Sequence, residues 1–131
     1  MIGVEMRAFM LEDDPVRGGH IRDLLHQHGY NVTWATNFEE AQEAWLQSER
    51  PFDLALLDHD LGRPSLFGTG KMFARWVVEQ PNVCCTHFVV HSANTVAAPQ
   101  MVAILVDAKC RVARVWPDSI GIYLKMLKHA S

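Results

Sequence analysis

Short apolar runs alternate with amphipathic stretches along the whole chain. Five runs have the length and composition of strands. Between them, apolar residues recur at three- and four-residue spacing, which predicts helices. The run at residues 52–57 is almost entirely apolar, which is typical of a parallel strand covered on both faces. We expect strands at residues 4–11, 31–36, 52–57, 87–90 and 111–116.

Polar residues and prolines mark the ends of the expected helices. Asp14 followed by Pro15 predicts a helix start with Asp14 as its cap, and Gly29 predicts the end of that helix. Asn37 with Glu40 three residues later resembles a capping box, in which Glu40 reaches back to the cap residue. The later helices are expected to begin near Thr69, Pro99 and Asp118.

Five strand–helix units in 131 residues predict an α/β fold. Parallel crossovers are right-handed, which leaves few topologies. At this length we expect a flavodoxin-like (βα)5 doubly wound parallel five-stranded sheet with strand order 2-1-3-4-5. The sequence has no internal repeat and no linker-like segment, so residues 1–131 are expected to form a single domain.

Composition narrows the classes of partner. The net charge of −3 argues against a general grip on duplex DNA, which needs clustered Lys and Arg. No apolar run approaches the roughly 18 residues of a membrane span, and no signal peptide is evident. The three cysteines lack a C-x-x-C spacing and are interpreted as buried, reduced thiols. A cytoplasmic location is therefore expected.

Polar clusters follow three of the expected strands, at residues 12–14, 58–60 and 91–94. In a sheet of this order, ligands bind beyond the carboxyl ends of the strands, where the strand order reverses. The three clusters are therefore expected to converge on one crevice.

Carboxylates crowded at such an edge raise one another's pKa, and a hard divalent cation relieves the repulsion. We expect Glu12, Asp13 and Asp58 to bind Mg²⁺ or Mn²⁺. Helix capping is the alternative interpretation of the first cluster, and it is favoured for Asp14 alone. Asp58 is interpreted as a metal ligand or nucleophile, with a turn-forming aspartate as the alternative.

Several further residues have both a functional and a structural interpretation. His59 and His91 are candidate acid–base groups or phosphate contacts, but also fit a loop histidine and a strand-end histidine. Asn94 fits either a ligand contact or a turn or cap. Trp116 fits either a base-stacking residue or a packed rim residue. Arg63 fits a solvated loop charge better than a phosphate clamp.

Three segments resemble the response-regulator receiver family: Leu-Glu-Asp-Asp-Pro at 11–15, Leu-Leu-Asp at 56–58 and Ser-Ala at 92–93. The resemblance spans nearly the whole chain. It implies that Asp13 and Asp58 bind Mg²⁺ directly, that Glu12 acts through water and that the carbonyl of Asp60 completes the site. It also implies that Asp58 accepts a phosphoryl group and that Ser92 contacts it.

Two positions depart from that family. Receivers carry Lys-Pro after the fifth strand, whereas this chain has Trp116-Pro117, and Ala113 stands near the position of the family's aromatic residue. The motifs Leu-Asp-His-Asp-Leu-Gly at 57–62, Thr-Gly at 69–70 and His-Ser-Ala-Asn at 91–94, with Met101, resemble a divergent branch, the cyclic-phosphate-processing receivers. That resemblance implies action on cyclic nucleotides or on RNA ends that carry a cyclic phosphate.

Three functional hypotheses remain open at this point. The first is a metal-dependent phosphoesterase acting on a cyclic phosphate. The second is a single-domain receiver phosphorylated on Asp58 in a phosphorelay. The third is a pseudo-receiver that binds a protein partner without catalysis.

Overall fold

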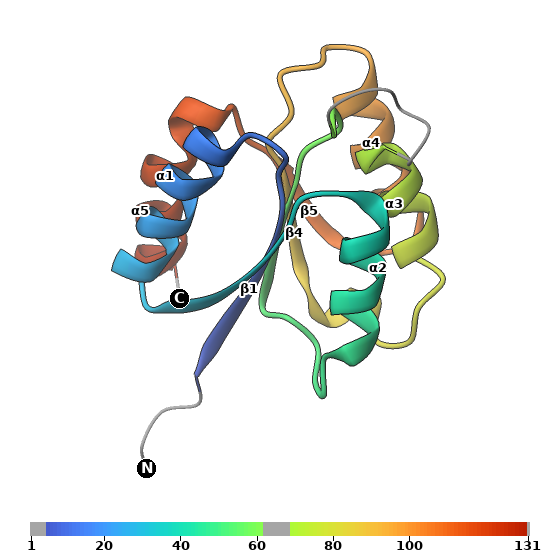
Figure 1. Cartoon of the computed structure of the whole chain (residues 1–131), viewed down its shortest axis with the longest axis horizontal. Coiled ribbons are helices and arrows are strands. Elements are labelled where there is room, and N and C mark those ends of the chain that lie inside the picture. The colour runs from blue at the N-terminus through green and yellow to red at the C-terminus, as the bar shows by residue number, and fades with distance from the viewer. Residues whose placement is uncertain (1–4, 62–68, 131) are drawn as a thin grey trace.

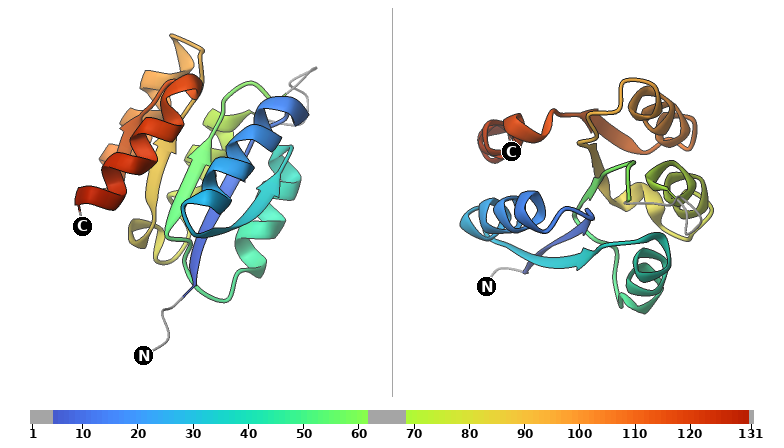
Figure 2. Two further views of the ribbon diagram at one scale, coloured as in Figure 1. Left: turned by 90° about the vertical axis from the view of Figure 1, so that its left-hand side faces the viewer. Right: turned by 45° about the horizontal axis from the view of Figure 1, so that its top comes forward.

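The computed structural model describes residues 5–61 and 69–130 as a parallel sheet between two helical layers (Figure 1). The strands are β1 (Met6–Leu11), β2 (Tyr30–Ala35), β3 (Leu54–Leu57), β4 (His87–Val90) and β5 (Arg111–Arg114). The helices are α1 (Pro15–Gln27), α2 (Phe38–Gln47), α3 (Gly70–Val77), α4 (Ala97–Asp107) and α5 (Ile120–Ala130), with 3-10 turns η2 (Val83–Cys85) and η3 (Pro117–Ser119). Figure 2 shows α1 and α5 on one face of the sheet and α2, α3 and α4 on the other.

The strands follow the order β2-β1-β3-β4-β5 with parallel pairing throughout, which confirms the predicted flavodoxin-like topology. Their last residues are in register. Leu11 is paired with Ala35 on one side and Leu57 on the other. Leu57 is paired with Val90, and Val90 with Arg114. The residues that follow the strands therefore also form a row along the carboxyl edge of the sheet.

The core has two parts because successive strand residues point to opposite faces. Phe9 lies on the side of α2, α3 and α4, where its ring stacks on Phe73 with a centroid separation of 5.4 Å and meets Trp45 edge-on. Met10 belongs to the opposite cluster, with Ile21 of α1. β3 and β4 are buried along their whole length, whereas β2 and β5 are partly exposed edges.

The first two helix starts match the sequence pattern closely. The Asp14 carboxylate accepts hydrogen bonds from two amides of the first turn of α1, at 2.9 and 3.1 Å, and Pro15 is the first helical residue. Asn37 caps α2 by accepting from the amide of Glu40 at 2.9 Å. The Glu40 carboxylate reaches back to the amide of Thr36, one residue earlier than the capping box predicts.

Some predicted bounds were wrong for identifiable reasons. α4 begins at Ala97, two residues before Pro99, because a proline within the first turn lacks only an amide that needs no helical partner. Asp118 lies inside η3 and does not directly begin α5. β5 ends at Arg114 because the chain turns into η3 at Pro117. Residue 4, the expected start of the first strand, lies outside the described residues.

The cysteines differ in burial. Cys110 is buried as predicted, but Cys84 and Cys85 are exposed, because they lie on η2, a surface turn that leads into β4. All three thiols are free. Among the helices of residues 5–61 and 69–130, none has the length and hydropathy of a membrane span.

Adjacent glycines of α1 provide a test of this packing. Gly18 is buried, and a Cβ there would overlap the indole of Trp34, whereas a Cβ at Gly19 meets only the end of Arg22 at 3.9 Å. We expect Gly18→Ala to destabilise the fold by about 1–3 kcal/mol through overpacking. Gly19→Ala should stabilise it by about 0.5–1 kcal/mol through helix propensity.

Urea unfolding of the two variants and the wild type measures both effects. Equal stability changes in the two variants would contradict the close approach of Trp34 to α1.

Candidate functional site

Three polar residues occupy the first position after three neighbouring strands. Backbone bonds continue the ladder past the strand ends: the amide of Asp58 donates to Leu11 O, and the amide of His91 donates to Leu57 O, each at 3.0 Å. The amide of Glu12 donates to Ala35 O, also at 3.0 Å. The structure therefore places Glu12, Asp58 and His91 in one row, as the sequence pattern predicted.

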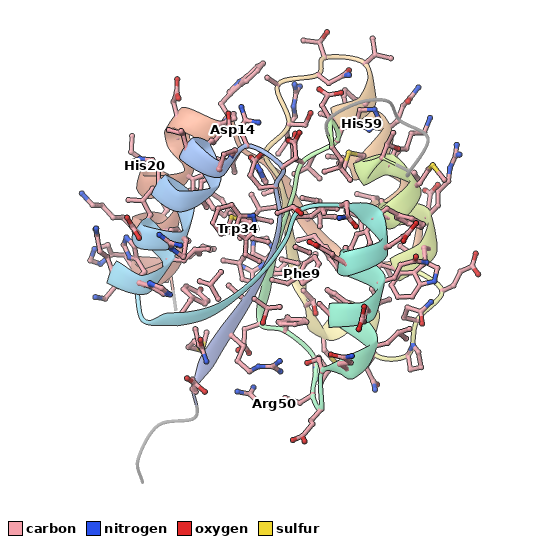
Figure 3. The ribbon with its side chains drawn as sticks, in the orientation of Figure 1. Phe9, Asp14, His20, Trp34, Arg50 and His59 are labelled. Carbon is pink, nitrogen blue, oxygen red and sulfur yellow. The ribbon has the colours of Figure 1, made fainter. Side chains whose placement is uncertain are left out.

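Glu12, Asp13 and Asp58 form an acidic pocket. One side-chain oxygen from each lies within 4.8 Å of the others, and among the described residues this is the group of such side chains able to hold a metal ion. Glu12 and Asp58 are buried, and Asp13 is partly exposed. Figure 3 shows Asp14 and His59, the neighbours of this pocket, at the same end of the sheet. A set of carboxylate oxygens suits a hard cation such as Mg²⁺.

Asp58 is in an unfavourable electrostatic environment without a cation. Burial, and then the negative charge of Glu12, raise its pKa from 3.8 to about 6. The neighbouring His91 and Arg17, and the amide of His59, 2.8 Å from Asp58 Oδ1, only partly oppose this. A divalent ion would relieve the same repulsion, so the donor set fits the predicted metal.

Glu12 is fully buried but stays ionised. Burial raises its pKa, yet hydrogen bonds from His91, Arg17 and the amide of Asp14 outweigh burial and lower it to about 2. Its carboxylate accepts hydrogen bonds from Arg17 Nε at 2.7 Å and Nη2 at 3.0 Å, and from the amide of Asp14 at 3.1 Å. His91 Nε2 lies 3.0 Å from Oε1. Because both oxygens of Glu12 already have hydrogen-bond partners, its carboxylate is better placed to contact a metal through a water than as a direct ligand.

Arg17 is the site residue that sequence reasoning missed. Its Nη2 also lies 3.4 Å from Asp58 Oδ2, so one guanidinium contacts both buried carboxylates. A signal was present, because a cation in the first turn of a helix opposes the helix dipole and needs an explanation. Its partner Glu12 was not identifiable from the sequence, because a five-residue separation across a turn fits no standard pairing.

His59 lies half-buried at the start of the loop after β3. Its Nδ1 accepts a hydrogen bond from the amide of Lys71 at 3.3 Å, which assigns the proton of the neutral ring to Nε2. Burial lowers the pKa of His59, and the charge of Lys71 lowers it further against the opposing charge of Asp60. At neutral pH the side chain is therefore a neutral N–H donor.

Gly70 fixes the position of His59. The amide of Gly70 donates to His59 O at 2.9 Å, and a Cβ at Gly70 would overlap the carbonyl oxygen of Asp58. Thr69 caps α3 by accepting from the amide of Met72 at 3.2 Å. The Thr-Gly pair singled out in the sequence therefore seats the start of α3 directly on the Asp58–His59 peptide.

The first two residues after β4 are buried. His91 is fully buried beneath Glu12, and its Nδ1 has no hydrogen-bond partner among the described residues. Ser92 is also buried, and its hydroxyl accepts from the amide of Asn94 at 3.1 Å. The side-chain oxygen of Asn94 accepts from two amides at the start of α4, at 3.0 and 2.8 Å. Asn94 therefore stabilises the turn that leads into α4, as its turn-or-cap interpretation predicts, and a ligand contact by its amide nitrogen stays a prediction.

Trp116 and Asp60 lie at the rim. Trp116 is 51% exposed, and the guanidinium of Arg114 lies over its ring at 4.7 Å. Asp60 is exposed, and its role as a carbonyl ligand stays a prediction. Gly62 and Arg63 lie outside the described residues.

Two hollows of about 280 and 420 Å³ lie elsewhere. The larger is lined by the first residues of all five strands, and the smaller includes Arg50, which Figure 3 shows at the end of the sheet opposite His59. Neither includes a residue of the acidic pocket.

Comparisons with known proteins agree with this geometry. The family model described as "Cyclic-phosphate processing Receiver domain" matches residues 9–107. Among curated proteins, none shows significant sequence similarity to the chain.

Solved receiver structures share the fold. The non-phosphorylated HemR receiver domain of Leptospira biflexa is 25% identical, with a TM-score of 0.71 over 95% of this chain and 92% of that one. The chemotaxis protein CheY4 of Vibrio cholerae is 18% identical, with a TM-score of 0.71 over 96% and 98%. A response regulator receiver protein of Pseudomonas putida is 15% identical, with a TM-score of 0.74 over 98% and 99%.

The raised pKa of Asp58 predicts a pH-dependent stability. In metal-free protein the folded state holds the Asp58 proton more tightly than the unfolded state. The free energy of unfolding therefore decreases as pH rises from about 4 through about 6, because Asp58 ionises there in the folded state. Asp58→Asn removes that penalty. We expect the variant to be more stable than wild type above pH 6 by at most about 3 kcal/mol, and the difference to vanish near pH 4.

Thermal unfolding in EDTA across this pH range measures the difference. Adding Mg²⁺ should stabilise the wild type and leave Asp58→Asn unchanged. A variant that is less stable than wild type at pH 8 would show that Asp58 is not strained by its neighbours.

Gly70 predicts a second, local effect. Gly70→Ala should push α3 away from the Asp58–His59 peptide and weaken Mg²⁺ binding about tenfold or more, since a misplaced ligand loses most of its coordination. Gly121→Ala is the matched control, because a Cβ there makes only ordinary contact with Leu24. Calorimetric titration with Mg²⁺ compares the two, and equal affinities would show that the α3 junction does not shape the pocket.

Proposed function

The chain belongs to the cyclic-phosphate processing receiver domain family, and we propose that its acidic pocket binds a divalent cation and opens the phosphodiester ring of a cyclic phosphate. The observation that carries the proposal is the position of His59. It is a neutral N–H donor, half-exposed, and follows directly after the buried carboxylate Asp58.

The metal would be held mainly by Asp13 and Asp58, with the carbonyl of Asp60 as a further oxygen ligand. Glu12 is buried beside these two residues and adds its negative charge to the pocket. When bound, Mg²⁺ or Mn²⁺ would neutralise phosphate charge and lower the pKa of a coordinated water.

The side chains of this protein would position and polarise the substrate. His59 Nε2 donates to a non-bridging phosphate oxygen, while its Nδ1 remains engaged by the amide of Lys71. A neutral imidazole in this form is a poor proton donor to an alkoxide, so we assign His59 to charge stabilisation in place of general acid catalysis. His91, buried against Glu12, is assigned to holding that carboxylate in place.

The proposed reaction is hydrolysis. Water attacks phosphorus, a new P–O bond forms and one ring P–O bond breaks. The attacking water loses its proton to solvent, and the released ribose oxygen takes a proton from solvent. The product is a phosphomonoester with a free hydroxyl. The ligand is expected to be a cyclic nucleotide or a cyclic-phosphate RNA end.

Phosphoryl transfer to Asp58 is the second candidate. It is favoured by the position of Asp58 at the end of β3, beside the row formed by Glu12 and His91. Against it, Trp116 stands where receivers place a lysine. A pseudo-receiver that binds only a protein partner would show neither reaction.

A turnover assay separates these candidates. We expect Mg²⁺-dependent opening of 2′,3′-cyclic-ended RNA or of a cyclic nucleotide, abolished by Asp13→Asn with Asp58→Asn. His59→Ala should lower the rate about 100-fold, since it removes a preorganised donor to the phosphate. His20→Ala is the matched control, because His20 is an exposed histidine on α1, and this variant should keep the wild-type rate.

Beryllofluoride labelling of Asp58 without turnover would instead favour the phosphorelay candidate. Absence of both turnover and label, in a protein that is folded, would leave only the protein-binding candidate.

A further inference from the structure

The Arg17 side chain bridges the two buried carboxylates of the acidic pocket. It forms a bidentate pair with Glu12 through Nε at 2.7 Å and Nη2 at 3.0 Å, and a longer contact with Asp58 at 3.4 Å. The Arg17 side chain is 38% exposed, whereas those of Glu12 and Asp58 are 0% and 4% exposed. Arg17 therefore covers the pocket on its solvent side.

The position of this cation is unfavourable for the helix. Arg17 is the third residue of α1, where the helix dipole disfavours positive charge. Asp14, which caps the same turn, offsets part of that cost. Helix formation does not account for an arginine here, but the charge of the two carboxylates does.

Oδ1 of Asp58 accepts a hydrogen bond from the amide of His59 at 2.8 Å, so a divalent ion bound by Asp58 would take Oδ2 and compete there with the guanidinium. The Arg17–Asp58 contact, with which the ion competes, is long at 3.4 Å, whereas the two Arg17–Glu12 hydrogen bonds are shorter, at 2.7 and 3.0 Å. An ion can thus displace Arg17 from Asp58 without removing it from Glu12. The guanidinium carries five donors in a planar fork that matches phosphate oxygens.

We propose that Arg17 is an exchangeable counterion of this pocket. It compensates part of the negative charge of Glu12 and Asp58 in metal-free protein, releases Asp58 when a divalent ion binds, and then pairs with the phosphate oxygens of the ligand. This inference rests on the proposed function, and it assigns to α1 the phosphate-binding cation that receivers carry after the fifth strand and that Trp116 replaces.

Two affinities test the proposal because they should change in opposite directions. Arg17→Gln removes the competing charge, so we expect Mg²⁺ to bind about tenfold more tightly to it than to wild type. Inorganic phosphate should bind the Mg²⁺-saturated variant about tenfold more weakly. Arg17→Lys keeps the charge but loses the fork, so its Mg²⁺ affinity should match wild type and its phosphate affinity should fall about threefold.

Isothermal titration with Mg²⁺, and then with inorganic phosphate on Mg²⁺-saturated protein, measures both affinities. Arg22→Gln is the matched control, since Arg22 lies on the same helix and contacts only Asp23 and the ring of Trp34 among the interactions resolved here. It should leave both affinities unchanged. Circular dichroism and thermal unfolding establish that each variant is folded, and Arg17→Lys carries the test if Arg17→Gln is not.

The outcomes separate this inference from the function on which it rests. A folded Arg17→Gln that binds Mg²⁺ no more tightly than wild type overturns the counterion exchange while the metal site stands. Unchanged phosphate affinity overturns the ligand contact. If neither wild type nor any variant binds Mg²⁺, the metal site of the proposed function is absent and the exchange is overturned with it.

Discussion

The register of the parallel sheet forces two carboxylates to lie side by side in a buried position. Leu11 and Leu57 are paired as the last residues of β1 and β3, so Glu12 and Asp58 follow as direct neighbours. Their mutual repulsion in a partly desolvated environment is the main electrostatic constraint of the molecule. The surrounding groups respond to it unequally, because Glu12 is held ionised while the pKa of Asp58 rises.

Much of the local architecture serves to support Glu12. His91 reaches it from β4, Arg17 from α1, and the indole of Trp34 donates to its carbonyl oxygen at 2.8 Å. Trp34 in turn fits only because Gly18 leaves space for it on α1. The packing of α1 against the sheet is therefore coupled to the charge of the pocket. Asp58 remains the carboxylate whose negative charge its neighbours do not fully compensate.

The opposite side of the pocket is organised by α3. Its first residue, Gly70, packs on the Asp58–His59 peptide, and its next amide, from Lys71, fixes the tautomer of His59. The pocket therefore combines a carboxylate that benefits from a cation with a neutral donor suited to an anionic ligand. This combination is the basis on which we propose action on a cyclic phosphate.

The fold and the row of Glu12, Asp58 and His91 could be predicted from the sequence because they follow from hydrophobic periodicity and from the rule that ligand sites gather at the carboxyl edge of a parallel sheet. The contacts of Arg17 could not, since they depend on how α1 leaves the sheet and on side-chain conformation. The burial of His91 and Ser92 was missed for a similar reason, because the pattern locates a strand end but not the depth of the side chains beyond it. The structural role of Asn94 in the turn before α4 became evident only from its hydrogen bonds to the amides of Val96 and Ala97.

The most direct measurement of the central claim is the anomalous diffraction of a crystal soaked with Mn²⁺. We expect one strong peak between the carboxylates of Asp13 and Asp58, with Arg17 still paired with Glu12 and no longer in contact with Asp58. An ion bound elsewhere, or an acidic pocket that stays free of Mn²⁺ with Arg17 still bridging both carboxylates, would contradict it.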